Sequence, residues 1–252
     1  MTKPIEFSKQ SNNFVSNRKI PFIGSKDYRE LKANWSGTGI VTSGGGLKYG
    51  TNAYMNLRYI YDVLKSDLHS ELWYVGTEER IDPLFRDLKE RYPDKIDIID
   101  AEIVEKSYPF KGNLKGYPIK PYCMTHSKFE TILFIDSDCF IHIKPEDLLS
   151  TKIYQEHEAL FCADIDLFHQ SSGRLHVKSK NYQVPKLGTW NQHTHIWDYS
   201  KSNPIWKILG IREDNLPEFE SGLMCMNKNL HIDSLLYSLF LNENFSILFP
   251  SS

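Results

Sequence analysis

The sequence has few cysteines, no long apolar run and almost no excess of charge of either sign. Its four cysteines lie far apart and form no Cys-x-x-Cys pair, which favours reduced, buried thiols over disulfides or a zinc site. No stretch approaches the roughly 20 consecutive apolar residues that a membrane-spanning helix needs. The N-terminus also lacks the apolar segment of a secretory signal peptide. We therefore expect a soluble chain that is cytoplasmic as it stands.

Net charge and composition narrow the class of protein further. The formal net charge is −2 and the sequence pI is near 6.5, so we expect no nucleic-acid partner. With 252 residues, 40% hydrophobic and 25% charged, the chain is long enough for one large α/β domain or two small ones. Residues 1–35 are polar, with many Asn, Ser and Lys. We expect them to form an N-terminal extension, followed by one domain over residues 36–252.

Segments with the patterns of strands and helices alternate along this domain. Predicted strands at 39–42, 71–75, 95–99 and 132–135 alternate with predicted helices at 51–64, 78–91 and 121–129. Further predicted helices lie at 144–149, 204–209 and 229–241, and further strands at 158–165 and 220–226. Alternation of strands and helices is typical of a parallel sheet with right-handed crossovers. The sequence therefore predicts an α/β fold with a mostly parallel central sheet.

Two carboxylates follow the most apolar of the predicted strands. The run Ile132–Ile135 leads directly into Asp136 and Asp138, which are separated by one residue. In an open α/β sheet, ligands bind at the carboxyl ends of the strands. Two acidic groups beside an apolar core repel each other unless a cation compensates them, and a hard divalent ion such as Mn²⁺ or Mg²⁺ prefers oxygen ligands. A plain turn at the strand end is the alternative, because Asp and Ser favour turns.

A glycine-rich loop follows the first predicted strand. Gly44, Gly45 and Gly46 are followed by a predicted helix that Thr51 or Asn52 would cap. The apolar residues of that helix share one face, which we expect to be buried: Ala53, Leu57, Ile60 and Leu64. A strand, a glycine-rich loop and a helix in this order present backbone N–H groups to phosphate. The loop matches neither the dinucleotide-binding nor the P-loop signature. A turn that binds no ligand is the alternative.

A basic segment at residues 101–120 is expected to be a loop. Lysines, the last of them Lys120, interleave there with aromatic residues. One interpretation is a solvated loop. The other is a wall that supplies cations to a diphosphate.

Four segments carry a resemblance to a known family. They are Gly39–Gly46, Lys120–Tyr122 together with Phe129–Asp138, Pro204–Gly210 and Glu220–Gly222. In their order they resemble the nucleotide-sugar glycosyltransferases of the GT-A type. More narrowly, they resemble the mannosyltransferase family that includes the fungal α-1,3-mannosyltransferases. The resemblance covers about residues 39–241 and implies a Rossmann-like three-layer αβα sandwich.

The resemblance also implies a reaction and a set of site residues. It implies Mn²⁺ or Mg²⁺ on Asp136 and Asp138, with Asp136 also near the ribose of a GDP- or UDP-sugar. It places Gly44, Gly45 and Gly46 near the nucleotide and Lys120 near the phosphates. Asp164 and Glu220 match acidic positions near the transferred sugar and the acceptor. The implied reaction moves a hexose, mannose-like, to a hydroxyl of a glycan or glycoprotein with retention of the anomeric configuration.

Other functions stay open at this stage. A sugar-phosphate nucleotidyltransferase also uses paired aspartates on a strand, but its glycine-rich signature is not found. A non-catalytic nucleotide- or sugar-binding domain, or a structural protein, is the remaining alternative.

Two departures from the family bear on the extent of the chain. Family members of the fungal secretory pathway carry an N-terminal membrane anchor, and they carry a further acidic or His motif beyond the segment that matches Glu220–Gly222. We find neither in this sequence and expect a shortened form. If it is part of an anchored enzyme, the expected compartment is the Golgi lumen.

Overall fold

The computed structural model describes residues 34–163, 190–191, 196–197 and 219–244. The chain divides into two compact units, which are treated separately: residues 1–160 with 222–252, and residues 161–221. In the second unit, β6 (Trp190–Asn191) pairs antiparallel with β7 (Ile196–Trp197). Among the described helices, none combines the length and the apolar character that a membrane span requires.

Six strands form one sheet in the order β3-β2-β1-β4-β8-β5. They are β1 (Thr38–Ser43), β2 (His69–Tyr74), β3 (Ile96–Asp100), β4 (Thr131–Ile135), β5 (Ala159–Ala163) and β8 (Phe219–Asn227). β1 pairs in parallel with both β2 and β4, and β2 pairs in parallel with β3. β8 runs antiparallel to β4. The predicted α/β fold with a mostly parallel sheet is confirmed.

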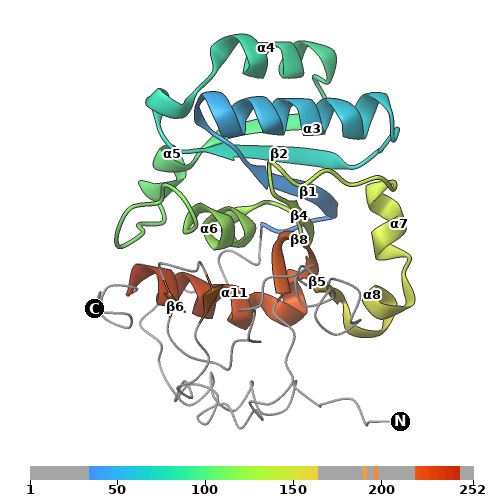
Figure 1. Cartoon of the computed structure of the whole chain (residues 1–252), viewed down its shortest axis with the longest axis vertical. Helices are drawn as coiled ribbons and strands as arrows, with labels where there is room; N and C mark the ends of the chain where they lie inside the picture. Colours follow the sequence, from blue (N-terminus) through green and yellow to red (C-terminus); the bar gives the residue numbers. More distant parts are fainter. Residues whose placement is uncertain (1–33, 164–189, 192–195, 198–218, 245–252) are drawn as a thin grey trace, which may run out of the picture. The chain divides into compact units, whose positions relative to one another are not determined.

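Helices cover both faces of this sheet. Figure 1 shows α3 (Thr51–Asp62) and α4 (Asp82–Arg91) on one face, and α6 (Ile119–His126) and α11 (Lys228–Glu243) on the other. Successive residues of a strand point to opposite faces, so β4 contributes side chains to two separate hydrophobic cores. Ile132 and Phe134 pack with the α6 and α11 side, whereas Leu133 and Ile135 pack with the α3 and α4 side. The continuous apolar run of β4 follows from burial on both faces.

The glycine-rich loop and its helix differ from the prediction in one respect. A π-helical turn, η1 (Gly46–Gly50), runs directly into α3. The backbone is therefore already helical at Gly50, before the expected cap residues Thr51 and Asn52. No side-chain cap bond forms there, and the hydroxyl of Thr51 instead donates to the carbonyl of Leu47 at 2.6 Å. The predicted cap by Thr51 or Asn52 is therefore wrong. The predicted buried face is confirmed for Ala53, Leu57 and Ile60, whereas Leu64 follows the end of α3 and is half-buried.

Several helices begin at other residues than the sequence predicts. α4 begins at Asp82 after a short 3-10 turn, η2 (Thr77–Glu79), because Pro83 fits only in the first turn of a helix. The segment expected to be a loop contains α5 (Ala101–Glu105), which the side chain of Asp100 caps, and α6 starts at Ile119. α7 (Pro145–Leu149) was expected, whereas α8 (Lys152–His157) was not. The helix predicted at 204–209 lies outside the described residues.

The cysteines that the structure describes are reduced. Cys123, Cys139 and Cys225 form no disulfide, and Cys123 and Cys225 are fully buried. Burial raises the pKa of the Cys123 thiol well above its usual value. The prediction of reduced thiols is confirmed for these three residues.

Candidate active site

The two aspartates of the predicted metal site lie in a tight turn at the carboxyl end of β4. Burial of the apolar run fixes the strand, and its last residue, Ile135, is completely buried. The backbone N–H of Asp136 donates to the carbonyl of Gly222 at 2.7 Å, and that of Cys139 donates to the carbonyl of Asp136 at 3.0 Å. Asp138 lies between these two bonds and its side chain is exposed. The turn over residues 136–139, called the aspartate turn below, therefore has a defined backbone.

Asp136 is already paired with a cation of the chain. The ammonium nitrogen of Lys120 lies 2.5 Å from Oδ2 of Asp136, and the side chains are 16% and 20% exposed. Lys120 lies in the first turn of α6, which packs against β1 and α11. The expected compensation of charge at the strand end is thus present for Asp136, and a lysine provides it. Asp138 differs, because its exposed carboxylate is solvated.

The buried Asn56 of α3, which the sequence interpretation missed, also contacts this turn. Its side chain is 2% exposed, and its Nδ2 donates to the carbonyl of Cys139 at 2.8 Å and to that of Asp136 at 3.4 Å. The sequence does contain a pattern that could have pointed to this residue. Asn56 is a polar residue at helical spacing from Ala53 and Ile60, on the face that must be buried.

The glycines of the loop are required by close packing. A Cβ atom at Gly44 would lie 2.7 Å from the carbonyl oxygen of Tyr49, and one at Gly45 would lie 2.6 Å from the Cβ of Glu79. Gly46 has a φ of +64°, which a side chain would strain. The N–H of Gly44 donates to the carbonyl of Trp73 at 2.9 Å, so that donor is used within the fold. A nucleotide-binding role for Gly44, Gly45 and Gly46 stays a prediction.

The structure does not test the remaining predicted residues, Asp164 and Glu220. Asp164 lies outside the described residues. Glu220 lies in β8, two residues before Gly222, and its side chain also lies outside them. In the part of the chain that the structure describes, no three His, Cys, Asp or Glu side chains are grouped as metal ligands. Their predicted roles stay predictions.

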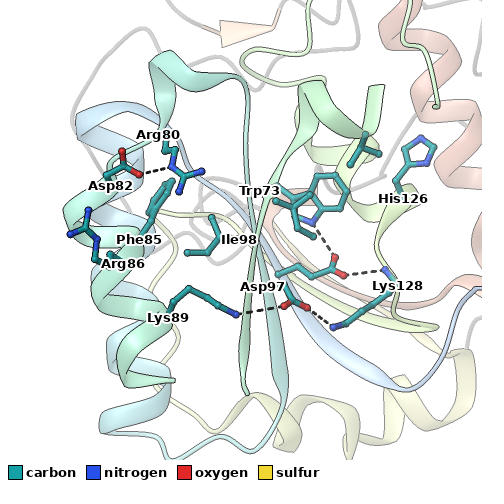
Figure 2. Close-up of a pocket in the computed structure, with 13 residues that line it drawn as sticks. Trp73, Arg80, Asp82, Phe85, Arg86, Lys89, Asp97, Ile98, His126 and Lys128 are labelled. Atoms are coloured by element: carbon teal, nitrogen blue, oxygen red, sulfur yellow. Dashed lines mark hydrogen bonds and ion pairs between the residues drawn. The ribbon is translucent and has the colours of Figure 1, made fainter. Parts of the chain in front are cut away.

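A cavity of about 830 Å³ lies elsewhere, along the edge strand β3 (Figure 2). None of the predicted site residues lines it. Two ion pairs lie among its charged side chains: Arg80 with Asp82 at 2.5 Å, and Lys128 with Asp97 at 2.5 Å. Lys89 donates to the carbonyl of Ile96 at 2.7 Å, which occupies part of the open edge of the sheet. The cavity therefore gives no reason to move the candidate site away from the aspartate turn.

The sequence of the chain matches a known protein family. The family described as "Mannosyltransferase putative" matches residues 37–250. The chain belongs to this mannosyltransferase family. The resemblance inferred from the sequence is thereby confirmed.

Two curated relatives of the chain are fungal mannosyltransferases. It is 25% identical over 226 residues to the Saccharomyces cerevisiae "Alpha-1,2-mannosyltransferase MNN2", covering 84% of this chain and 36% of that protein. It is 22% identical over 163 residues to the Candida albicans protein of the same name, covering 60% of this chain and 27% of that protein. The chain thus spans about a third of the length of these relatives.

One solved structure supports the fold. The "WbbM bifunctional glycosytransferase apo structure" superposes with a TM-score of 0.52 at 12% identity, covering 82% of this chain and 37% of that one. At this identity the likeness concerns the fold alone. Together with the sheet order and the family, it confirms the predicted Rossmann-like GT-A class.

Proposed function

We propose that the chain is a metal-dependent glycosyltransferase that moves a mannose-like hexose from a GDP- or UDP-sugar to a hydroxyl group of a glycan. Membership of the mannosyltransferase family supports the reaction class. The main observation in favour of a site at the aspartate turn is the position of Asp136, which is held at the end of β4 and paired with Lys120. This is the end of the strands at which open α/β sheets bind their ligands.

The residues of the turn fit a divalent cation that binds together with a diphosphate. Asp136 and Asp138 offer hard carboxylate oxygens, and Mn²⁺ or Mg²⁺ often takes only one or two carboxylates, with phosphate oxygens and water completing its coordination. The exposed carboxylate of Asp138 is open to such an ion. When bound, the ion would neutralise charge on the departing nucleoside diphosphate.

The residues of the chain would position the donor and acceptor. Lys120 is close enough to the turn to hold a phosphate oxygen in place of its present partner, and Asp136 would then be released toward the ribose or the cation. The glycines Gly44, Gly45 and Gly46 would let the nucleotide approach the backbone. Asp164 and Glu220 would lie near the transferred sugar, where carboxylates stabilise positive charge at the anomeric carbon. Retention of the anomeric configuration is part of this proposal.

A thermal-shift screen tests the proposal. The full chain is heated with GDP, UDP, GDP-mannose and UDP-sugars, each with and without Mn²⁺, because a ligand that binds only the native state raises its melting temperature. We expect one nucleotide with Mn²⁺ to raise Tm by about 5 °C at a concentration about 100-fold above Kd. In the Asp138→Asn variant, Mn²⁺ should no longer add to the increase in Tm that the nucleotide causes. Equal melting temperatures of the wild type under all conditions would overturn the proposal.

A further inference from the structure

We propose that Asn56 is a positioning residue that sets the geometry of the aspartate turn, and through it the affinity for a divalent cation with a nucleoside diphosphate. This inference rests on the proposed function. Asn56 would act by holding the backbone of the aspartate turn, without contacting the cation or the nucleotide.

One amide group holds both ends of the turn. Nδ2 of Asn56 donates to the carbonyl of Cys139, the last residue of the turn, and to that of Asp136, the first. These partners lie 83 and 80 positions away in the sequence, so the bonds link α3 to the end of β4. Asp138, between the two carbonyls, takes its position from a backbone that Asn56 fixes.

The helix that carries Asn56 also supports the glycine-rich loop. α3 continues directly from η1, and Gly44 packs so closely on Ala53 that an added Cβ would lie 2.8 Å from the Cβ of that alanine. Ala53 precedes Asn56 by three residues, so the two lie on the same face, about one turn apart. α3 therefore fixes two segments of the proposed donor site relative to each other.

Stability alone does not explain an asparagine at this position. The face around it is apolar and includes Leu57 and Ile60. Oδ1 of Asn56 is buried and has no hydrogen-bond partner within the described residues. A buried amide oxygen without a partner is unfavourable for folding. The geometry that Nδ2 imposes on the turn gives a reason for this residue.

Tyr61 of the same helix offers a matched control. It is also buried, and its hydroxyl bonds to the carbonyl of Leu68 at 3.0 Å, to Oγ of Ser70 at 2.5 Å and to the carbonyl of Lys95 at 3.1 Å. These partners lie around the start of β2 and β3, away from the aspartate turn. Tyr61→Phe therefore removes buried hydrogen bonds of α3 without touching the proposed site.

The experiment compares the Mn²⁺ affinity of the wild-type chain with that of its variants. Electron paramagnetic resonance measures free Mn²⁺ in titrations with saturating GDP or UDP, and Tm is recorded for each protein. The variants are Asn56→Leu, Asn56→Ala, which leaves room for water if the leucine does not fold, and Tyr61→Phe. All should lower Tm. Only the Asn56 variants should raise the Kd for Mn²⁺, by about tenfold or more, as changes to groups that orient metal ligands do.

The outcomes separate this inference from the proposed function. A wild type that binds no Mn²⁺ with either nucleotide overturns both. A wild type that binds, with Asn56 variants of unchanged Kd, overturns the inference and leaves the proposed function standing. A Kd that rises equally in Tyr61→Phe shows a general loss of stability and likewise overturns the inference.

Discussion

Lys120 and Asp136 form an ion pair 2.5 Å long that joins the first turn of α6 to the end of β4. Both side chains are mostly shielded from water, so the carboxylate of Asp136 would be a poorly solvated, uncompensated charge without Lys120. The shielded carboxylate of Asp136 at the end of a buried strand requires a cation, and the chain itself provides one. The same ammonium group lies where a diphosphate is proposed to bind.

Replacing Lys120 should affect both stability and nucleotide binding. In Lys120→Met the carboxylate of Asp136 loses its partner, which should lower the free energy of unfolding by about 1–3 kcal/mol. The affinity for GDP or UDP should fall as well. Denaturant unfolding and calorimetric titration measure the two effects.

Lys115 provides the control for this variant. It lies in the same basic segment and pairs with Glu78 at 3.1 Å on the surface. Because exposed pairs contribute little, Lys115→Met should cost less than about 1 kcal/mol. If Lys120→Met and Lys115→Met were equally stable and bound nucleotide equally, the account of the Lys120 pair would be wrong.

The two aspartates should differ when each is replaced by asparagine. Asp138 is exposed, so Asp138→Asn should change the free energy of unfolding by no more than about 0.5 kcal/mol, while removing the Mn²⁺-dependent part of nucleotide binding. Asp136→Asn removes the mostly shielded negative charge that lies 2.5 Å from the ammonium nitrogen of Lys120 and should cost about 1–3 kcal/mol. Unfolding and Mn²⁺ titrations on both variants check this. If Asp138→Asn were less stable than Asp136→Asn, the different roles given to the two aspartates would be wrong.

The glycine-rich loop should tolerate alanine poorly, for a different reason at each position. Gly45→Ala would place a Cβ against Glu79 and should cost about 1–3 kcal/mol through overpacking. Gly46→Ala meets open space but must adopt positive φ, which should cost about 1 kcal/mol. Thermal unfolding measures both. A Gly45→Ala variant at least as stable as the wild type would contradict the close packing described.

His126 as a whole is half-buried, but both of its ring nitrogens are buried, and this should make the protein sensitive to acid. Its ring packs on Tyr108 and Tyr122, with centroids 4.7 Å and 4.4 Å away, and neither ring nitrogen has a partner within the described residues. Desolvation, with a smaller contribution from the charge of Lys228, lowers the pKa of His126 to about 3. Between the usual histidine pKa near 6.5 and this value, the unfolded chain binds a proton that the folded chain does not. Stability should therefore fall as the pH falls through this range.

The test compares the wild type with His126→Phe, which keeps an aromatic ring but cannot titrate. Between pH 6 and 4 the wild type should lose up to about 1.4 kcal/mol per pH unit relative to the variant. Denaturant unfolding at several pH values gives the two profiles. Parallel profiles would show that His126 does not bring about the acid sensitivity.

Local sequence patterns were sufficient to predict much of the fold. β4 was predicted because burial on both faces makes Ile132–Ile135 continuously apolar. The face of α3 was predicted because Ala53, Leu57 and Ile60 recur at helical spacing. The start of α4 was misplaced because Pro83 restricts the first turn, and the cap of α3 was wrong because a π-helical turn precedes it. Such errors concern boundaries, where local signals compete.

The contacts within the site could not be predicted in the same way. Lys120 and Asp136 were each singled out, but their pairing depends on α6 packing against β1, the strand next to β4. Asn56 was missed because its importance comes from two carbonyls more than 75 positions away. Long-range contacts of this kind are decided by tertiary packing, which neither periodicity nor short motifs encode.

The most direct test of the account is transfer of radiolabelled mannose from GDP-mannose to a simple α-mannoside by the full chain, with UDP-hexoses assayed in parallel. The account predicts Mn²⁺-dependent transfer from one of these donors, which chelation and Asp138→Asn each reduce more than about a hundredfold. An Asp138→Asn variant that keeps the wild-type rate, wild-type transfer that continues unchanged in chelator, or no transfer from any of these donors would contradict it.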